Sequence, residues 1–234
     1  MRVNELFTGI MGESSFVGVP AAFVRLQGCD VYCTHCDTKY AQNPNGGKKM
    51  TVKQVVKWVE KKRLHTVLVT GGSPEMHEDF DKLVRYLAAQ HKVVVETSGC
   101  HKINWLLPCH WVVDIKPPSA GKNAYTMSRK FLRDCQPRVA YHSSHQAQVE
   151  WKIVLDFKNQ SDFRYFKKVL YELPDFSRVY VSATQVGGLD KYRKTLQEFI
   201  PWLIKFYARR GPWPKLYLNA QLHKLIYGIN KRGV

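Results

Sequence analysis

The sequence predicts one α/β domain built on a parallel sheet that curves into a partial, abbreviated β/α barrel. Short apolar runs alternate along the chain with segments of helical apolar spacing, and this alternation is typical of parallel βαβ units. Polar motifs follow several of the apolar runs, and the carboxyl ends of the strands form the active face of parallel barrels. The connections are short for a complete eightfold barrel, although 234 residues suffice for one domain with a large core.

The first predicted strand covers residues 3–7, and the glycine-rich loop after it contains Glu13. The second strand covers 21–27. Its side chains alternate between two faces, with Phe23, Arg25 and Gln27 on one and Ala22, Val24 and Leu26 on the other. Arg25 is therefore expected on one face of the sheet, close to the end of its strand.

The next elements follow a loop rich in Asn, Pro and Gly. Residues 51–54 have the pattern of a capping box, and valines at helical spacing predict a helix that runs to about Leu64. Residues 66–70 are continuously apolar, as in a buried parallel strand, and the pair Gly71–Gly72 ends that run. An apolar stripe predicts the following helix over 80–87.

The same pattern repeats in the second half of the chain. Further strands are predicted at 92–98, 111–116, 150–157, 178–183 and 215–218, and further helices at 128–135, 162–173 and 191–207. The segment 117–149 is otherwise expected to be irregular. Pro201 is expected to interrupt or bend the last helix, because proline has no N–H to donate.

The charge balance favours anionic partners, since the chain has 36 basic and 19 acidic residues and a net charge of +17. The excess is spread over several predicted helices, and no zinc-finger or RNP-type aromatic motif is present, so direct nucleic-acid binding is disfavoured. A negatively charged protein, such as a flavodoxin-like reductant, fits the charge at least as well.

The sequence also bears on where the protein works. No apolar run approaches the ~20 residues that a membrane-spanning helix needs, and no secretory signal opens the chain. Cys100, Cys109 and Cys135 show no disulfide pattern. We expect a cytoplasmic protein, because reduced thiols persist in that compartment.

The clearest chemistry lies in Cys29, Cys33 and Cys36, which share one short loop directly after the 21–27 strand. Thiolates are soft ligands that suit iron–sulfur clusters, zinc or copper(I). Ordinary four-iron clusters take four cysteines, so three on one loop predict a cluster with one iron open to another ligand. Zinc with His35 as a fourth ligand, and three inert buried thiols, stay open as alternatives.

Three further polar motifs come at predicted strand ends. Gly71–Gly72 allows the backbone to approach a ligand closely, or forms a plain turn. The segment Glu96–Gly99 offers an acid and two hydroxyls to a ligand, or caps a helix. Asp114 and Lys116 share one face of their strand, with Ile115 on the other, and an ion pair at the barrel rim would explain them equally well.

Glu13 and Arg25 are the candidate substrate pair. Arginine binds carboxylates through two parallel hydrogen bonds, and glutamate accepts from ring N–H groups. Mutual pairing of the two residues, without any ligand, is the alternative.

The spacing C-x₃-C-x₂-C after a strand resembles the cluster loop of the radical S-adenosylmethionine (SAM) enzymes. The further motifs resemble the 7-carboxy-7-deazaguanine synthase family, and the resemblance covers nearly the whole chain. They are Gly12-Glu13, Val24-Arg25-Leu26, Cys36-Asp37-Thr38, Thr70-Gly71-Gly72-Ser73-Pro74, Glu96-Thr97-Ser98-Gly99, Asp114-Ile115-Lys116-Pro117-Pro118-Ser119-Ala120-Gly121 and Gln221-Leu222-His223-Lys224.

This resemblance implies a radical SAM domain over residues 1–234, with its cluster loop at 29–36 and a C-terminal segment, 215–234, that closes the substrate site. The implied reaction is ring contraction of 6-carboxy-5,6,7,8-tetrahydropterin to 7-carboxy-7-deazaguanine with release of ammonia, in 7-deazapurine biosynthesis. The implied cofactors are a 4Fe-4S cluster, SAM and Mg²⁺. The family is usually homodimeric.

The resemblance also implies roles for single residues. Cys29, Cys33 and Cys36 are implied as ligands of the cluster, and Thr38 is implied as a ligand of the magnesium ion. The residues implied in SAM binding are His35, Cys36, Asp37, Gly71, Gly72, Ser73, Ser98, Gly99, Asp114, Ile115 and Lys116. The residues implied in substrate binding are Ile10, Met11, Gly12, Glu13, Arg25, Thr97, His223 and Val234.

The chain departs from the family at Ser73, where the family turn has glutamate. Serine cannot fully replace a charge-assisted hydrogen bond to the SAM ammonium, which is worth roughly 1.5–3 kcal/mol. We expect weaker SAM binding with partial rescue by Ser73, because Pro74 is expected to aim Glu75 away from the site. On that view Ser73→Glu tightens SAM binding about tenfold, and Glu75→Ala changes little.

Two other functions compete with this interpretation. A glycyl-radical-enzyme activase shares the cysteine spacing, but it would leave Glu13, Arg25 and His223 without a role. A basic metal-binding nucleic-acid module belongs to a different class. Anaerobic reconstitution separates them, since a four-iron cluster gives brown protein and a single zinc gives colourless protein.

Overall fold

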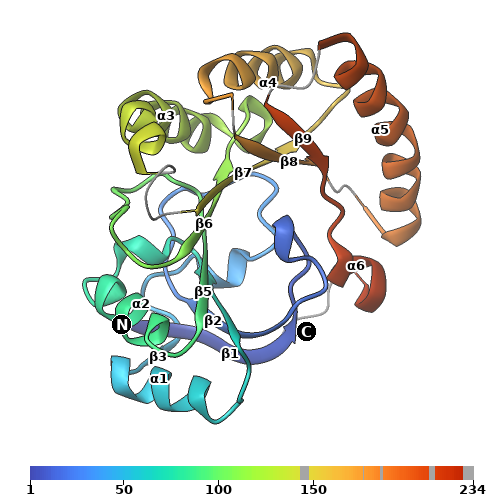
Figure 1. Ribbon diagram of the computed structural model, residues 1–234. Helices are drawn as coiled ribbons and strands as arrows, with labels where there is room; N and C mark the ends of the chain where they lie inside the picture. Colours follow the sequence, from blue (N-terminus) through green and yellow to red (C-terminus); the bar gives the residue numbers. More distant parts are fainter. Residues whose placement is uncertain (143–147, 176, 185–186, 211–213, 229–234) are drawn as a thin grey trace.

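In the part of the chain that the structure describes, nine strands form one sheet in the order β3-β1-β2-β4-β5-β6-β7-β8-β9 (Figure 1). The computed structural model describes residues 1–142, 148–175, 177–184, 187–210 and 214–228. The strands are β1 (Arg2–Ile10), β2 (Pro20–Leu26), β3 (Lys48–Lys49), β4 (Thr66–Gly71), β5 (Lys92–Thr97), β6 (His110–Ile115), β7 (Gln148–Leu155), β8 (Arg178–Ala183) and β9 (Lys215–Leu218).

The seven strands β2 and β4 to β9 run parallel to their neighbours, while β1 pairs antiparallel with both β2 and β3. Among the described residues the two outermost strands, β3 and β9, do not pair with each other, so the curved sheet stays open. The predicted fold class, an α/β domain with a partial parallel barrel, is confirmed.

Helices α1 to α5 lie along the outside of the curved sheet, and α6 lies on the other side, near the loops that follow β1 (Figure 1). The helices are α1 (Val52–Glu60), α2 (Phe80–Ala88), α3 (Lys122–His142), α4 (Gln160–Glu172), α5 (Leu189–Arg210) and α6 (Leu222–Tyr227). The short 3₁₀ turns are η1 (Ser14–Phe16), η2 (Lys39–Ala41), η3 (Pro74–Met76) and η4 (Pro118–Ala120). None of these helices, within the described ranges, has both the length and the apolarity that a membrane crossing requires.

The predicted alternation of β2 is confirmed, because its two faces contribute to different apolar clusters. Val24 and Leu26 join the large core between the sheet and the outer helices. Phe23 joins a smaller core inside the curve of the sheet, together with Leu68 and Val94 from the next strands. The inner face is thus apolar near the strand starts, which leaves the strand ends for polar side chains.

The structure corrects the segment 117–149, where only the helix 128–135 was expected. Helix α3 begins six residues earlier, at Lys122, and continues to His142. Its buried stripe includes Ala124, Ser128 and Leu132 at four-residue spacing. Because two of these residues are small and one is polar, the stripe carries little of the apolar signal on which helix prediction depends.

Pro201 does not interrupt helix α5, which continues through it from Leu189 to Arg210. Buried side chains on both sides of the proline, including Phe199 and Leu203, pack into the outer core. This packing offsets the single hydrogen bond that proline cannot donate.

Candidate functional site

The candidate site lies at the carboxyl ends of four neighbouring parallel strands, β2, β4, β5 and β6. The three-cysteine loop follows β2, Gly71 ends β4, Thr97 ends β5 and Ile115 ends β6. Motifs that are far apart in the sequence therefore meet at one edge of the sheet, as expected for a parallel barrel.

The three loop cysteines, Cys29, Cys33 and Cys36, are free thiols and each is partly exposed. Cys29 and Cys33 pack against a small apolar cluster around Val31, which Cys100 also borders. Burial raises the pKa of Cys33 and the pKa of Cys36 above the ordinary thiol value. A metal that binds these sulfurs as thiolates must therefore displace their protons.

Hydrogen bonds hold the cysteine loop in place. The Thr34 N–H donates to the Ala120 carbonyl at 2.9 Å, and the side-chain amide of Asn123 donates to the Asp30 carbonyl at 2.9 Å. The Asp30 carboxylate also lies 2.8 Å from Nε2 of His101. Contacts with η4, α3 and the loop after β5 thus fix the conformation of the loop independently of any ligand.

Gly72 brings the turn after β4 into direct contact with the cysteine loop. A Cβ atom at Gly72 would lie 2.0 Å from the Gly28 carbonyl oxygen and 2.7 Å from Cβ of Cys29, so only glycine fits. The Ser73 N–H donates to the same Gly28 carbonyl at 2.8 Å. Ser73 Oγ lies 3.5 Å from Sγ of Cys29. The close approach that Gly71–Gly72 predicted is an approach to the cysteine loop.

A network of buried charges crosses the site. Nζ of Lys152, on β7, lies 2.6 Å from Oε2 of Glu13 and 3.2 Å from Oδ2 of Asp114. Nζ of Lys116 lies 2.9 Å from the same Asp114 oxygen, so the predicted alternative of an ion pair between Asp114 and Lys116 is realised. Burial opposes ionisation of Glu13 and Asp114, but the lysines more than offset it and hold the pKa of both carboxyls below the usual value.

Sequence reasoning missed Lys152. The residue is buried and stands within a strand that is otherwise apolar around it, in the run Trp151–Leu155. A lysine is almost never fully buried unless it is paired. That contrast between residue and surroundings is the signal that could have identified it.

Four buried oxygen atoms at this edge have no hydrogen-bond partner among the described residues. They are Oε1 of Glu13, Oε2 of Glu75, Oγ of Ser98 and Oδ1 of Asp114. A buried polar atom without a partner costs about 1–3 kcal/mol. Glu75, Ser98 and Asp114 come from the ends of neighbouring strands, and Lys152 joins Glu13 to Asp114. These oxygens together fit a ligand that brings amino, hydroxyl or ring N–H donors.

Glu13 and Arg25 do not pair with each other, so the alternative of mutual pairing is wrong. Nε of Arg25 lies 3.0 Å from Oε2 of Glu5, on the neighbouring strand β1. Its guanidinium carbon lies 5.9 Å from the ring centre of Phe7 and 6.0 Å from that of Tyr40. Since the ion pair uses Nε, the two terminal NH₂ groups remain for a carboxylate ligand.

Glu75 is directed into the site, which corrects the expectation that Pro74 aims it away. Oε1 of Glu75 accepts a hydrogen bond from Oγ1 of Thr97, at the end of β5. Pro74 begins the 3₁₀ turn η3, in which successive side chains point about 120° apart. Met76 therefore points outward, with 43% of its surface exposed, while Glu75 points inward. Burial raises the pKa of Glu75 to about 7.

Helix α6 links two loops of the site. The Leu222 N–H donates to the Gly12 carbonyl at 3.1 Å. A Cβ on Gly12 would lie 2.0 Å from Nδ1 of His223, which places that imidazole against the loop after β1. Lys224 is buried, and its Nζ lies 2.6 Å from Oδ2 of Asp37, next to the last cysteine. His223 thus lies against the loop that carries Glu13.

Other predicted residues have local roles in the structure. The side chain of Met11 is 1% exposed in the inner core, and its N–H and C=O bond to Val19 and Gly18, both at 2.8 Å. Ile10 ends β1. The Ile115 side chain packs in the outer core, so only its backbone is open to a ligand at the strand end.

The remaining predicted residues lie at the margins of the site. His35 is exposed on the cysteine loop. Thr38 is partly exposed, and its hydroxyl donates to Oδ1 of Asp37 at 2.8 Å. Gly99 has a left-handed φ of +64°, and a Cβ there would lie 2.7 Å from the Phe131 ring. Val234 lies outside the described residues.

The donor set fits an iron–sulfur cluster better than one metal ion. A single zinc ion needs all of its ligand atoms within about 2.0–2.3 Å. Among the described residues, no three His, Cys, Asp or Glu side chains are gathered closely enough to hold one ion. Three free thiols spread over one short loop can instead each bind a different iron of a cluster. Cys109 and Cys135 lie in the outer core and cannot contribute.

An open parallel β/α barrel with three thiols on the loop after its first parallel strand defines a radical SAM protein. The sequence model of the Radical SAM superfamily matches residues 23–106, which include that loop. In structure the chain resembles QueE from Escherichia coli, with a TM-score of 0.55 and 20% sequence identity over 93% of this chain and 92% of that one.

Curated relatives narrow the class further. The chain is 30% identical over 236 aligned residues to 7-carboxy-7-deazaguanine synthase from Chlorobaculum tepidum, covering 100% of this chain and 97% of that protein. It is 40% identical over 104 residues to the protein of the same name from Pyrobaculum aerophilum, covering 43% and 47% of the two chains. The chain belongs to the 7-carboxy-7-deazaguanine synthase family.

Proposed function

We propose that this protein converts 6-carboxy-5,6,7,8-tetrahydropterin to 7-carboxy-7-deazaguanine with release of ammonia, in 7-deazapurine biosynthesis. The observation that carries the proposal is the placement of three free thiols beside four buried oxygens that have no partner among the described residues. The thiols suit a cluster, and the oxygens suit a ligand rich in N–H and O–H donors.

Cys29, Cys33 and Cys36 hold the 4Fe-4S cluster in this proposal. When bound, the cluster and SAM together supply the carbon radical that removes hydrogen from the pterin. The chain positions SAM along the strand ends, with Gly71, Gly72 and Ser73 beside the cluster loop and Asp114 and Lys116 across from them. The other proposed contacts are His35, Asp37, Ser98, Gly99 and the Ile115 backbone.

Glu75 takes the role that the family assigns to the glutamate at the position of Ser73. It reaches the end of β5, and its free oxygen Oε2 is buried there. The ammonium group of SAM is the donor that an anionic carboxylate binds most strongly.

The pterin occupies the space among Glu13, Arg25, Thr97 and His223. Glu13 accepts from ring N–H groups through its free Oε1, and Arg25 binds the pterin carboxylate through its terminal NH₂ groups. Thr38 supplies one oxygen to a Mg²⁺ ion that otherwise keeps waters and a substrate carboxylate. Ile10, Met11 and Gly12 border this space, and the family resemblance adds Val234 to the proposed substrate contacts.

The proposal also covers the extent and setting of the protein. One domain spans 1–234, and its C-terminal segment 215–234 closes the substrate site, a role supported by the contacts of Leu222 and Lys224. We infer a cytoplasmic homodimer that receives electrons from a flavodoxin-like protein. The thiol loop supports a reducing compartment.

Product analysis tests the reaction directly. Anaerobically reconstituted protein is incubated with carboxytetrahydropterin, SAM, Mg²⁺ and dithionite, and chromatography with mass detection should show 7-carboxy-7-deazaguanine. The brown protein should contain about four irons per chain. Cys33→Ala should lose both the iron and the product, whereas Cys109→Ala, a buried thiol of the outer core, should keep the iron. Cleavage of SAM without any change in the pterin would favour a glycyl-radical-enzyme activase instead.

A further inference from the structure

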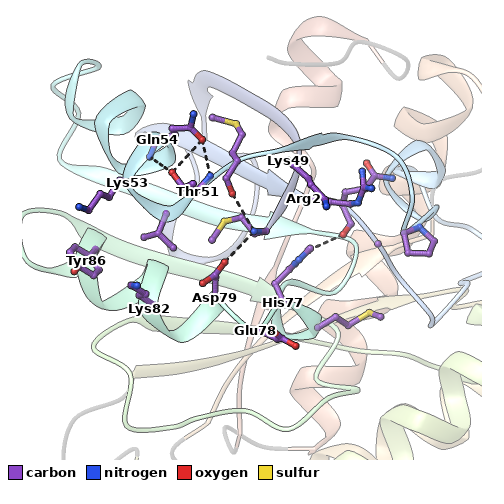
Figure 2. A pocket seen from close by; sticks show the side chains of 17 residues that line it. Arg2, Lys49, Thr51, Lys53, Gln54, His77, Glu78, Asp79, Lys82 and Tyr86 are labelled. Carbon is purple, nitrogen blue, oxygen red and sulfur yellow. Dashed lines mark hydrogen bonds and ion pairs between the residues drawn. The ribbon is translucent and has the colours of Figure 1, made fainter.

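A cleft of about 850 Å³ lies beside the start of the cysteine loop. The beginnings of β1 and α1, strand β3 and the segment from η3 into α2 line it, and Gln27 and Gly28 form part of its wall (Figure 2). It shares no residue with the side chains proposed to bind SAM, Mg²⁺ or pterin, so it is a separate feature of the surface.

The lining of this cleft is predominantly positive. Figure 2 shows Lys53 and Lys82 on one side and Arg2 and Lys49 on the other. Of the acids in the lining, Asp79 is paired with the amine of Met1 at 3.2 Å. Four cations around one hollow attract an anionic partner and orient it during encounter.

Two exposed apolar side chains indicate that this partner is a protein. Met76 is 43% exposed and Tyr86 is 52% exposed, and both line the cleft. Aromatic residues and methionine are enriched at protein interfaces. A small inorganic anion would gain nothing from them.

The wall of the cleft leads directly to the cysteine loop. Gly28 adopts a φ of +104° and has no side chain, and the next residue in the chain is Cys29. The cleft wall at Gly28 is therefore one residue along the chain from the first thiol of the loop. A partner seated here lies beside the start of the cysteine loop.

We propose that this cleft docks an acidic one-electron donor protein. The cations Arg2, Lys49, Lys53 and Lys82 orient the donor, and the Gly28 wall is where the electron enters the loop. The donor is oxidised by one electron and the cluster on the loop is reduced by one, with no bond made or broken between the proteins. The proposal rests on the proposed cluster function and adds to it the surface that serves it.

The test compares two charge reversals of equal size. Lys53→Glu/Lys82→Glu changes the cleft, and Lys194→Glu/Lys205→Glu changes exposed lysines of α5, which is on another part of the barrel (Figure 1). The probe is a recombinant flavodoxin of negative net charge, titrated calorimetrically into reconstituted protein at low ionic strength. The cleft variant should bind about tenfold or more weakly, with a smaller dependence on salt. The α5 variant should bind within about twofold of wild type.

A kinetic measurement separates docking from damage to the site. Reduction of the cleft variant by photoreduced flavodoxin should be slow, while its reduction and turnover with dithionite should match wild type. Equal binding by the cleft variant, or equal loss in the α5 variant, would overturn the proposal. So would a cleft variant that loses affinity for a 20-base-pair DNA duplex but not for flavodoxin. Failure of the proposed function would appear differently, as wild-type protein that forms no product with dithionite.

Discussion

Among single residues, Glu75 carries the clearest prediction about ligand binding. Its carboxyl contacts Thr97 with one oxygen, and the other oxygen is buried without a partner among the described residues. Burial raises the pKa of Glu75 to about 7, so a charge-assisted hydrogen bond to an ammonium group requires this carboxyl to release the proton that burial favours. Glu75 therefore connects SAM binding, proton release and stability at one position.

Glu75→Gln should weaken SAM binding by roughly ten- to a hundredfold, because it removes a charge-assisted hydrogen bond worth about 1.5–3 kcal/mol. Isothermal titration of the reconstituted proteins measures this. Glu78→Gln, an exposed glutamate three positions further along, is the matched control and should bind like wild type. Ser73→Glu should bring no gain, because Ser73 is 1% exposed and packed against Cys29. If Glu75→Gln bound SAM like wild type and Ser73→Glu bound it about tenfold more tightly, position 73 would be the one that contacts the SAM ammonium group.

The same residue predicts a dependence of stability on pH. The folded-state pKa of Glu75 is about 7, above its ordinary value of 4.5, so the folded protein holds a proton here that the unfolded chain releases. This contribution is fully present below about pH 4.5 and is lost as the pH rises through about 7, a change of about 3 kcal/mol. Urea unfolding of apoprotein at pH 5 and pH 8 measures it. Compared with wild type, Glu75→Gln should lose less stability over that interval; parallel profiles would contradict the assignment.

At the scale of elements, the ion pair between Lys224 and Asp37 connects α6 to the cysteine loop, and its two side chains differ in their exposure to solvent. The Lys224 side chain is 7% exposed, whereas that of Asp37 is 52% exposed. The surrounding chain partly desolvates the Asp37 carboxyl, but Lys224 more than offsets this and lowers the pKa of that carboxyl. Removing the buried partner and removing the exposed partner therefore have different consequences.

Asp37→Asn should loosen α6 more than Lys224→Met does. The first change leaves an ammonium group buried without its counter-charge, while the second replaces it with an apolar chain and leaves a carboxylate that water can reach. Hydrogen exchange of the amides in 222–227 measures the effect, and protection should fall by about tenfold or more in Asp37→Asn. Greater loss of protection in Lys224→Met would show that the buried ammonium is not the controlling group.

At the scale of the whole molecule, Lys152 joins parts of the chain that are far apart. It connects Glu13, which precedes β2, with Asp114 on β6. Lys152 and Glu13 are 139 positions apart in the sequence. Lys152→Met should cost about 3–5 kcal/mol, since it leaves the buried Glu13 carboxylate without its lysine and leaves Asp114 with Lys116 alone. Chemical denaturation measures the loss. The double variant Lys152→Met/Glu13→Gln should recover part of it, and purely additive losses would show that the two groups are independent.

Much of the fold could be predicted because it depends on local patterns. Apolar runs and glycine stops located the strands, and the capping box of α1 is present, with Thr51 and Gln54 bonding each other reciprocally. The parts that escaped prediction depend on tertiary context. Helix α3 buries small residues, Lys152 acquires its partners only when the strands assemble, and the direction of Glu75 follows from how η3 turns against β5.

The contact between Gly72 and the residues Gly28 and Cys29 also bears on how the cysteine loop and the turn after β4 move relative to each other. Two loops that touch backbone to backbone, and share the Gly28 carbonyl through the Ser73 N–H, are displaced together. We therefore expect thermal displacements of the cysteine loop and of the turn after β4 to be correlated. Each can move by some amount relative to the sheet while the spacing between them stays nearly constant, and that spacing is the one on which a reaction between their bound groups depends.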